Sequence, residues 1–139
     1  TSNYTVSYAS GRKNVGSYKV TVKFKGDYKG TVTKTFQIVP KGTTITTLKA
    51  GKKSFTAKWS RQKTQTTGYQ FSYTTDKKFK KSVKTITISK NTTVQKTVKK
   101  LKSKKLYYGK VRTYKTVKIN GKTTKLYSGW SSYKKVKTK

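Results

Sequence analysis

Strict alternation is the sequence feature that most restricts the fold of this chain. In residues 17–26, SYKVTVKFKG, every second residue is aromatic or β-branched, and lysine or threonine stands between. The same period of two recurs in NYTVSY (residues 3–8), SFTAKW (54–59) and GYQFSY (68–73). A period of two is that of a β-strand with one face buried. The chain is therefore predicted to be all-β, with antiparallel strands joined by turns.

The sharpest turn signal is the pair Asn120-Gly121, which lies between VKI and KTTKLY. A two-residue type I′ turn needs positive φ at both central residues, and Asn-Gly is the sequence that favours it most. The pair predicts a long hairpin whose arms run back toward Arg112 and Trp130.

The only proline, Pro40, divides the chain unequally. About three strands are expected before it, at roughly residues 4–8, 17–25 and 31–39. Seven are expected after it, centred near Thr46, Ala57, Phe71, Ile86, Val98, Val111 and Val136. Seven short antiparallel strands in this length predict a two-sheet sandwich, whereas three cannot close one. We therefore expect a partial β unit over residues 1–40 and a complete β-sandwich domain over residues 41–139.

Residues 43–139 resemble a fibronectin type III domain, of the lysine-rich kind found in large secreted proteins of Gram-positive bacteria. SFTAKW ends in a tryptophan, GYQFSY gives the Tyr-x-apolar-x-Tyr run, Leu101 precedes Tyr107 by six residues, and YSGWSS leads into the last strand. Gly109 departs from the pattern, since a β-branched residue is usual there, and marks a weak strand or close packing. The resemblance and the strand phase together imply a structural core of Trp59, Tyr69, Phe71, Tyr73, Leu101, Tyr107, Val111 and Trp130.

Residues 1–40 resemble the C-terminal half of a bacterial immunoglobulin-like surface repeat. The matching segments are YTVSY, NVGSYKVTV and FKGDYKGTVTKTFQIVP. The first strands of such a repeat are missing. Two explanations are open: the chain is a piece of a longer protein, or another copy of the chain supplies the absent strands by strand exchange. Head-to-tail exchange of this kind would build a filament.

The residues available for catalysis are few. The sequence has no histidine, cysteine or glutamate, and its only carboxylates are Asp27 and Asp76. These lie in separate turn-like segments, GDYKG and TTDKKF, where aspartate commonly bonds its own backbone. We therefore expect no enzyme activity, no catalytic or metal-binding residues and no cofactor. No apolar run is long enough to span a membrane.

The charge is extreme, because 36 lysines and arginines stand against 2 acidic residues, for a formal net charge of +34. In LKSKKLYYGKVRTYK (residues 101–115), strand phase directs Tyr107, Val111 and Thr113 inward. Tyr108, Lys110, Arg112 and Tyr114 then share the outer face. Together with the adjacent Lys115 they form a candidate polyanion-binding surface. The alternative interpretation is a solvated strand face whose lysine stems cover the rings. That interpretation explains the position of these charges but not their single sign.

Three functions are consistent with these observations. The first is a structural or adhesive module of an extracellular, cell-surface or cell-wall protein of a Gram-positive bacterium, held by diffuse attraction to anionic wall polymers such as teichoic acid or to acidic glycans. The second is a filament or adhesin subunit completed by another copy of the chain. The third, ranked last, is non-specific nucleic-acid binding, because no recognition helix or nucleic-acid motif accompanies the charge.

Overall fold

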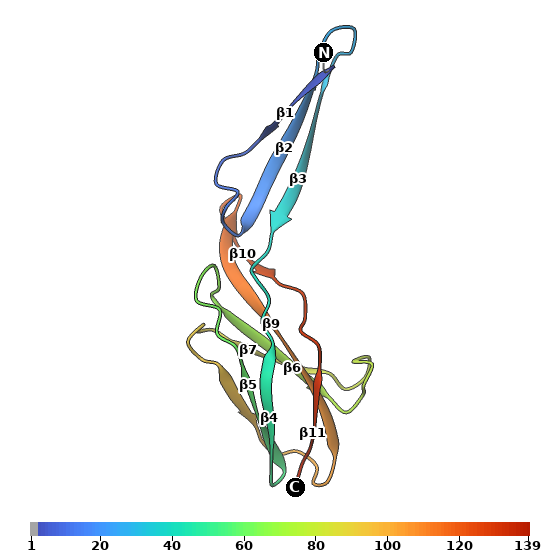
Figure 1. Ribbon diagram of the computed structural model, residues 1–139, viewed down its shortest axis with the longest axis vertical. Helices are drawn as coiled ribbons and strands as arrows, with labels where there is room; N and C mark the ends of the chain where they lie inside the picture. The colour runs from blue at the N-terminus through green and yellow to red at the C-terminus, as the bar shows by residue number, and fades with distance from the viewer. Residues whose placement is uncertain (1–2) are drawn as a thin grey trace.

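The computed structural model describes residues 3–139 as an elongated, all-β molecule, with the sheet of the first three strands at one end of the long axis and the C-terminus at the other (Figure 1). Residues 1–2 of the predicted 1–40 unit lie outside the described part. The strands are β1 (Tyr4–Tyr8), β2 (Gly16–Phe24), β3 (Thr31–Ile38), β4 (Ile45–Gly51), β5 (Ser54–Trp59), β6 (Gly68–Thr74), β7 (Lys84–Ile88), β8 (Gln95–Val98), β9 (Leu106–Ile119), β10 (Lys122–Tyr127) and β11 (Lys134–Lys137). No helix occurs between residues 3 and 139. The predicted all-β class is confirmed.

The first three strands form a separate antiparallel sheet in the order β1-β2-β3. Val22 stands opposite Val6 on one side and Val32 on the other, so the apolar residues of all three strands share one face. That face has no second sheet over it within residues 3–139. Of residues 3–39, only Val15 and Gly16 are buried. This unit is an open half of a sandwich, as its three strands predicted.

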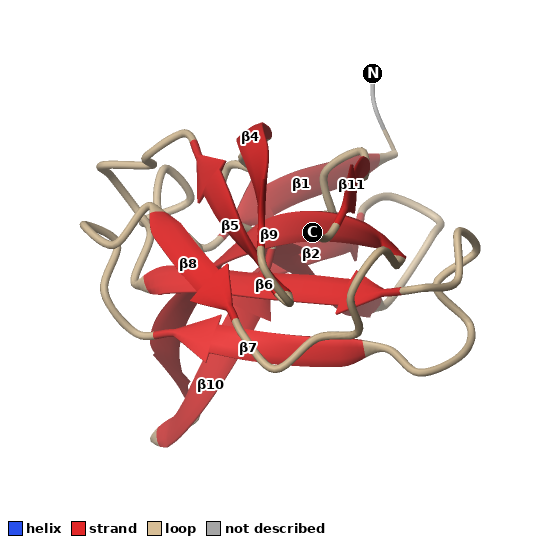
Figure 2. Ribbon diagram, turned by 90° about the horizontal axis from the view of Figure 1, so that it is seen from below, coloured by secondary structure: helices blue, strands red, loops and turns tan. Residues whose placement is uncertain are grey.

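The remaining strands build a closed two-layer sandwich (Figure 2). One sheet has the order β10-β9-β6-β7, with β11 also paired to β9, and the other has the order β4-β5-β8. Between them lies an aromatic core. Phe55 of the smaller sheet meets Phe71 and Tyr73 of the larger one edge to face, with ring centroids 6.1 and 5.8 Å apart. Such pairs add about 0.5–1.5 kcal/mol each beyond the apolar area that they bury.

Most of the predicted core is confirmed. Trp59, Tyr69, Phe71, Tyr73, Tyr107 and Val111 are all buried. Leu101 is half-buried and packs against this core. The backbone N–H of Lys102 donates to the Tyr107 hydroxyl at 3.2 Å, which is the tyrosine corner of such sandwiches.

The placement of Trp130 in the core was wrong. Its side chain is half-buried and packs against Lys110 and Arg112, on the face of the five-stranded sheet that points away from the core. The inward position was expected from the resemblance of YSGWSS to the entry of the last strand. The physical reason for the difference is a break in that strand between Tyr127 and Lys134, from which Trp130 turns outward.

The same break explains why eight strands follow Pro40 where seven were predicted. The last strand of the sandwich is divided into β10 and β11, and both pair with the long strand β9. The predicted hairpin is present between β9 and β10. Asn120 and Gly121 at its tip have φ values of 51° and 75°, as a type I′ turn requires.

The joint between the two units is held by specific polar contacts. The side-chain amide of Gln65 donates to Asn14 Oδ1 at 2.8 Å, and its oxygen accepts from the backbone N–H of Val15 at 3.2 Å. The Thr113 hydroxyl donates to the carbonyl of Lys41 at 2.7 Å, which fixes the connecting segment to the sandwich. The open sheet and the sandwich are therefore tied at two points.

Candidate functional site

Cations and aromatic rings alternate on the outer face of the five-stranded sheet. The Lys110 ammonium lies 4.2 Å from the Phe79 ring centroid and 5.0 Å from that of Trp130. The Arg112 guanidinium carbon lies 4.3 Å from the Trp130 ring centroid and 4.0 Å from that of Tyr127. We call these five side chains the cation–aromatic ladder. Each contact of this kind contributes about 0.5–2 kcal/mol, more as the cation loses water.

Arg112 has little capacity left for a ligand. The Tyr127 and Trp130 rings both pack on its guanidinium, and Nε and Nη2 both donate to the Gln70 side-chain oxygen, at 2.9 and 2.7 Å. Gln70 stands opposite Arg112 in the β6–β9 pairing, so the bond results from the strand register. Partial burial lowers the pKa of Arg112, although arginine stays charged at neutral pH in any case. Its cation is used chiefly to bind the sheet's own side chains.

Phe79 reaches the ladder from the β6–β7 loop at a conformational cost. Its φ is 53°, a left-handed value that is rare for a bulky side chain. The Asp76 carboxylate holds the loop by accepting the backbone N–H groups of Lys78, Lys80 and Lys81 at 2.8–3.0 Å. These bonds lower the pKa of Asp76. The turn role expected for Asp76 is thus confirmed.

Two serine hydroxyls bond to β9 across the break between β10 and β11. Ser128 Oγ accepts the backbone N–H of Thr113 at 3.0 Å, and Ser131 Oγ accepts that of Val111 at 3.1 Å. These side chains replace carbonyl groups that a continuous strand would offer to β9. The chain can therefore bulge outward between them, and Trp130 lies over the cations of β9.

Three of the five predicted surface residues lie together on the outer face, namely Tyr108, Lys110 and Arg112. Tyr114 has the same phase but is 2% exposed, because Tyr127 packs on it with ring centroids 5.9 Å apart. Burial raises the pKa of Tyr114. Lys115 comes directly after Tyr114 in the strand, so alternation places it on the opposite face. The five residues do not form one continuous surface.

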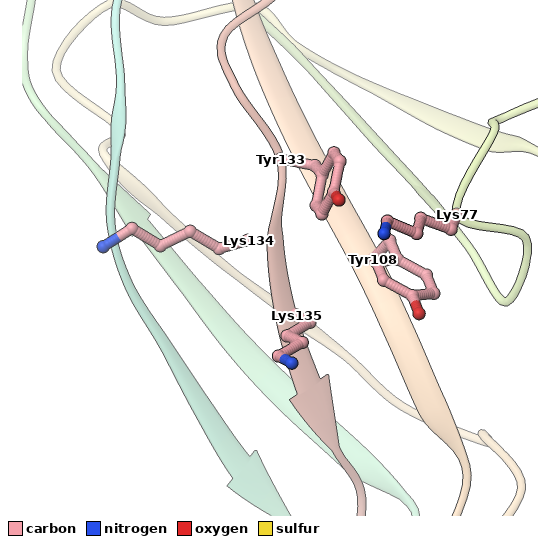
Figure 3. Close-up of a pocket in the computed structure, with 5 residues that line it drawn as sticks. All are labelled: Lys77, Tyr108, Tyr133, Lys134 and Lys135. Atoms are coloured by element: carbon pink, nitrogen blue, oxygen red, sulfur yellow. The ribbon is translucent and has the colours of Figure 1, made fainter.

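Next to the ladder lies a shallow pocket of about 400 Å³, lined by Lys77, Tyr108, Tyr133, Lys134 and Lys135 (Figure 3). The rings of Tyr108 and Tyr133 lie 5.4 Å apart at 86°. Only Tyr108 was singled out from the sequence. Phe79 and Lys77 lie in TTDKKFKKS, where one aromatic residue among lysines is a signal that would have pointed to this loop.

The carboxylates are too few and too scattered for paired acid–base chemistry. Asp76 belongs to the β6–β7 loop, whereas Asp27 belongs to the turn before β3. Residues 3–139 contain no group of three or more acidic, histidine or cysteine side chains that would hold a metal ion. Within the same residues, no helix is long and apolar enough to cross a membrane.

Comparison with known proteins places the fold. No family model matches the chain, and no curated protein matches it. The crystal structure of the FN1–FN3 domains of chicken CNTN1 matches with a TM-score of 0.58 and 18% identity, covering 90% of this chain and 43% of that one. Domains A168–A170 of titin match with a TM-score of 0.49 and 16% identity, covering 99% of this chain and 49% of that one. The chain spans less than half the length of either structure. Residues 41–139 have the β-sandwich fold of fibronectin type III domains, which the likeness to the CNTN1 structure supports.

Proposed function

We propose that this chain is a non-enzymatic structural module of an extracellular protein at the surface or wall of a Gram-positive bacterium. Diffuse electrostatic attraction to anionic polymers such as teichoic acid holds it at the envelope. The observation that carries the proposal is a formal net charge of +34 on a chain of 139 residues, most of which form an ordered sandwich. Like charges within a Debye length of about 8 Å repel one another, so polyanions relieve that repulsion and release counter-ions as they bind.

The shape supports a spacer role. Strand β1 and the C-terminus lie far apart along the long axis (Figure 1). Hydrogen bonds of Gln65 and of the Lys41 carbonyl tie the two units together. A module of this form would hold apart the groups attached to its two ends. The two scattered carboxylates offer no acid–base pair, which supports the absence of enzyme activity.

Retention on purified Gram-positive cell walls tests this proposal. We expect it to fall steeply as salt rises and to drop at low salt when the walls are stripped of teichoic acid. Equal retention on stripped and intact walls would refute the electrostatic part.

A second candidate is a filament or adhesin subunit in which a strand from another copy of the chain covers the sheet of β1–β3. The supporting observation is the apolar face of that sheet, where Val6 and Val32 are 43% and 44% exposed. Self-repulsion predicts that assembly grows with salt, the opposite of wall binding. Sedimentation velocity over a salt series separates the two, and a folded monomer at every salt concentration would count against assembly.

A further inference from the structure

The pocket beside the ladder has the shape and charge of a subsite for a sugar ring. We propose that it binds one saccharide ring bearing an anionic group, with the ring in the corner formed by Tyr133 and Tyr108 and the anion at Lys77 and Lys135. This inference rests on the proposed polyanion binding and gives it a local site. Its volume of about 400 Å³ lies in the range of small-ligand pockets, about 300–1,000 Å³.

The two tyrosines form a right-angled corner, because their rings meet at 86°. Tyr133 is 41% exposed, and Tyr108 is half-buried. A pyranose ring has an apolar C–H face and a rim of hydroxyls. A corner of this kind offers it an aromatic surface, and the phenol groups offer donors and acceptors for the rim.

Two of the three lysines that line the pocket are available to an anion. Among residues 3–139, neither the Lys77 nor the Lys135 ammonium has a hydrogen-bond or ion-pair partner. Lys134 differs, since its ammonium donates to the carbonyl of Thr46 at 2.9 Å and points away from the tyrosines (Figure 3). Lys77 extends toward Tyr108 in the same view, so one cation lies directly beside the aromatic corner.

The aromatic wall is supported from behind. The Tyr133 ring packs on Phe79 with centroids 6.3 Å apart, and Phe79 also packs on Lys110. The loop that carries Phe79 and Lys77 is clamped by the Asp76 carboxylate. Asp76 is the one negative group in this loop, and its oxygens are turned to backbone N–H groups. A wall fixed in this way loses little freedom when a ligand binds.

A sugar fits this corner better than a run of nucleobases. Single-stranded nucleic acid stacks successive bases on open aromatic faces along a groove. Here Tyr108 and Tyr133 are perpendicular, and Tyr133 is already packed against Phe79. The corner has room for one ring with an anionic substituent, either a carboxylate, as in a uronic acid, or a phosphate, as in a sugar phosphate.

The test compares ligands that differ in one property at a time. Oligogalacturonate supplies ring and charge, its methyl ester supplies the ring alone, and inorganic polyphosphate supplies charge alone. An oligomer of sugar phosphates distinguishes phosphate from carboxylate. Calorimetric titration at about 150 mM salt, where diffuse attraction is weakened, measures each dissociation constant.

The variants are Tyr133→Ala, Tyr133→Phe and the double variant Lys77→Ala/Lys135→Ala. The matched control is Lys49→Ala/Lys58→Ala, which removes the same charge from the exposed side of the smaller sheet. Tyr133 is exposed enough for its truncation to leave the fold intact, and the thermal midpoint of each variant checks this. Wild-type retention on cell walls is measured in parallel.

We expect Tyr133→Ala to weaken binding of at least one anionic saccharide roughly tenfold, as truncation of an aromatic anchor does, with polyphosphate binding unchanged. Tyr133→Phe should retain most of the affinity. The Lys77/Lys135 variant should weaken the saccharide more than its control does, and the methyl ester should bind poorly. If oligogalacturonate loses affinity in Tyr133→Ala, the anionic group is a carboxylate. If the sugar-phosphate oligomer does, the group is a phosphate.

The inference is overturned if Tyr133→Ala leaves the affinity for every anionic saccharide unchanged. It is equally overturned if the Lys77/Lys135 and Lys49/Lys58 double variants weaken saccharide binding to the same extent. It is also overturned if single-stranded oligothymidylate loses more affinity than the saccharides on Tyr133→Ala, since the pocket would then select nucleobases. Salt-sensitive wall retention alongside any of these results would leave the diffuse binding standing without the subsite.

Discussion

The guanidinium carbon of Arg112 lies 4.3 Å from the centre of the Trp130 ring, and the two residues come from β9 and from the break between β10 and β11. Trp130 is in this place because the hydroxyls of Ser128 and Ser131 bond to β9 on either side of it. The ladder thus joins a cation of β9 to the irregular segment between β10 and β11. A residue that looks like part of a polyanion site is a structural element of the sheet.

Arg112→Lys tests this role, because it keeps the charge but removes the planar group that packs on two rings and bonds twice to Gln70. We expect a loss of about 1–3 kcal/mol in the free energy of unfolding. Urea denaturation measures it, with Lys58→Ala as an exposed control that should stay within about 0.5 kcal/mol of wild type. Unchanged stability would mean that the ladder forms without strengthening the fold.

Gly109→Ala should destabilise the sandwich by about 1–3 kcal/mol through overpacking. A Cβ atom at Gly109 would lie 2.8 Å from Cζ of Phe71, whose ring is fully buried. Gly129→Ala is the matched control, since a Cβ there meets nothing within 4 Å. Equal midpoints for the two variants in thermal unfolding would show that Phe71 moves aside freely.

The sequence predicted the strands from local alternation. The period of two put Tyr107, Val111 and Thr113 inside, and all three are buried. Asn120-Gly121 predicted the hairpin because positive φ is a property of those two residues themselves. Gly109 was expected to mark a weak strand or close packing, and the distance to Phe71 shows close packing.

The candidate site was harder to predict because its parts come from distant segments. Tyr114 has the outward phase, yet Tyr127 of the neighbouring strand covers it. Trp130 lies where hydroxyl bonds replace strand pairing, so alternation gives no phase for it. Lys77 and Tyr133 reach the pocket from beyond the ends of β6 and β11 respectively. Only tertiary structure brings them together.

Gln65→Ala should loosen the joint between the open sheet and the sandwich. The Gln65 side chain bonds to Asn14 and to the backbone of Val15, and its removal breaks both bonds. Spin-label distances between β2 and β5 should broaden, whereas Gln95→Ala, a change on the exposed side of β8, should leave them unchanged. An unaltered distance distribution in Gln65→Ala would show that the Gln65 hydrogen bonds do not hold the joint rigid.

Acid should release the loop that supports the pocket. The pKa of Asp76 is lowered in the folded protein by bonds from the N–H groups of Lys78 and Lys80. The stability that its carboxylate contributes is therefore fully present above the ordinary pKa of aspartate, which is about 4. This contribution is lost as the pH falls through the lower pKa that Asp76 has in the folded protein. We expect amide exchange at Lys78, Lys80 and Lys81 to quicken in that range, beyond the normal pH dependence of exchange.

Asp76→Asn should show weak protection of these amides at every pH, and Asp27→Asn should behave as wild type. Equal protection in Asp76→Asn and wild type would contradict the clamp.

The salt dependence of binding to a long teichoic-acid polymer tests the central claim most directly. A plot of log K against log salt concentration should be linear with a steep negative slope, because each cation engaged releases a condensed counter-ion. Single lysine-to-alanine changes away from the pocket should shift that line only slightly. A flat plot, or one such lysine whose loss abolishes binding, would contradict envelope attachment by diffuse electrostatics.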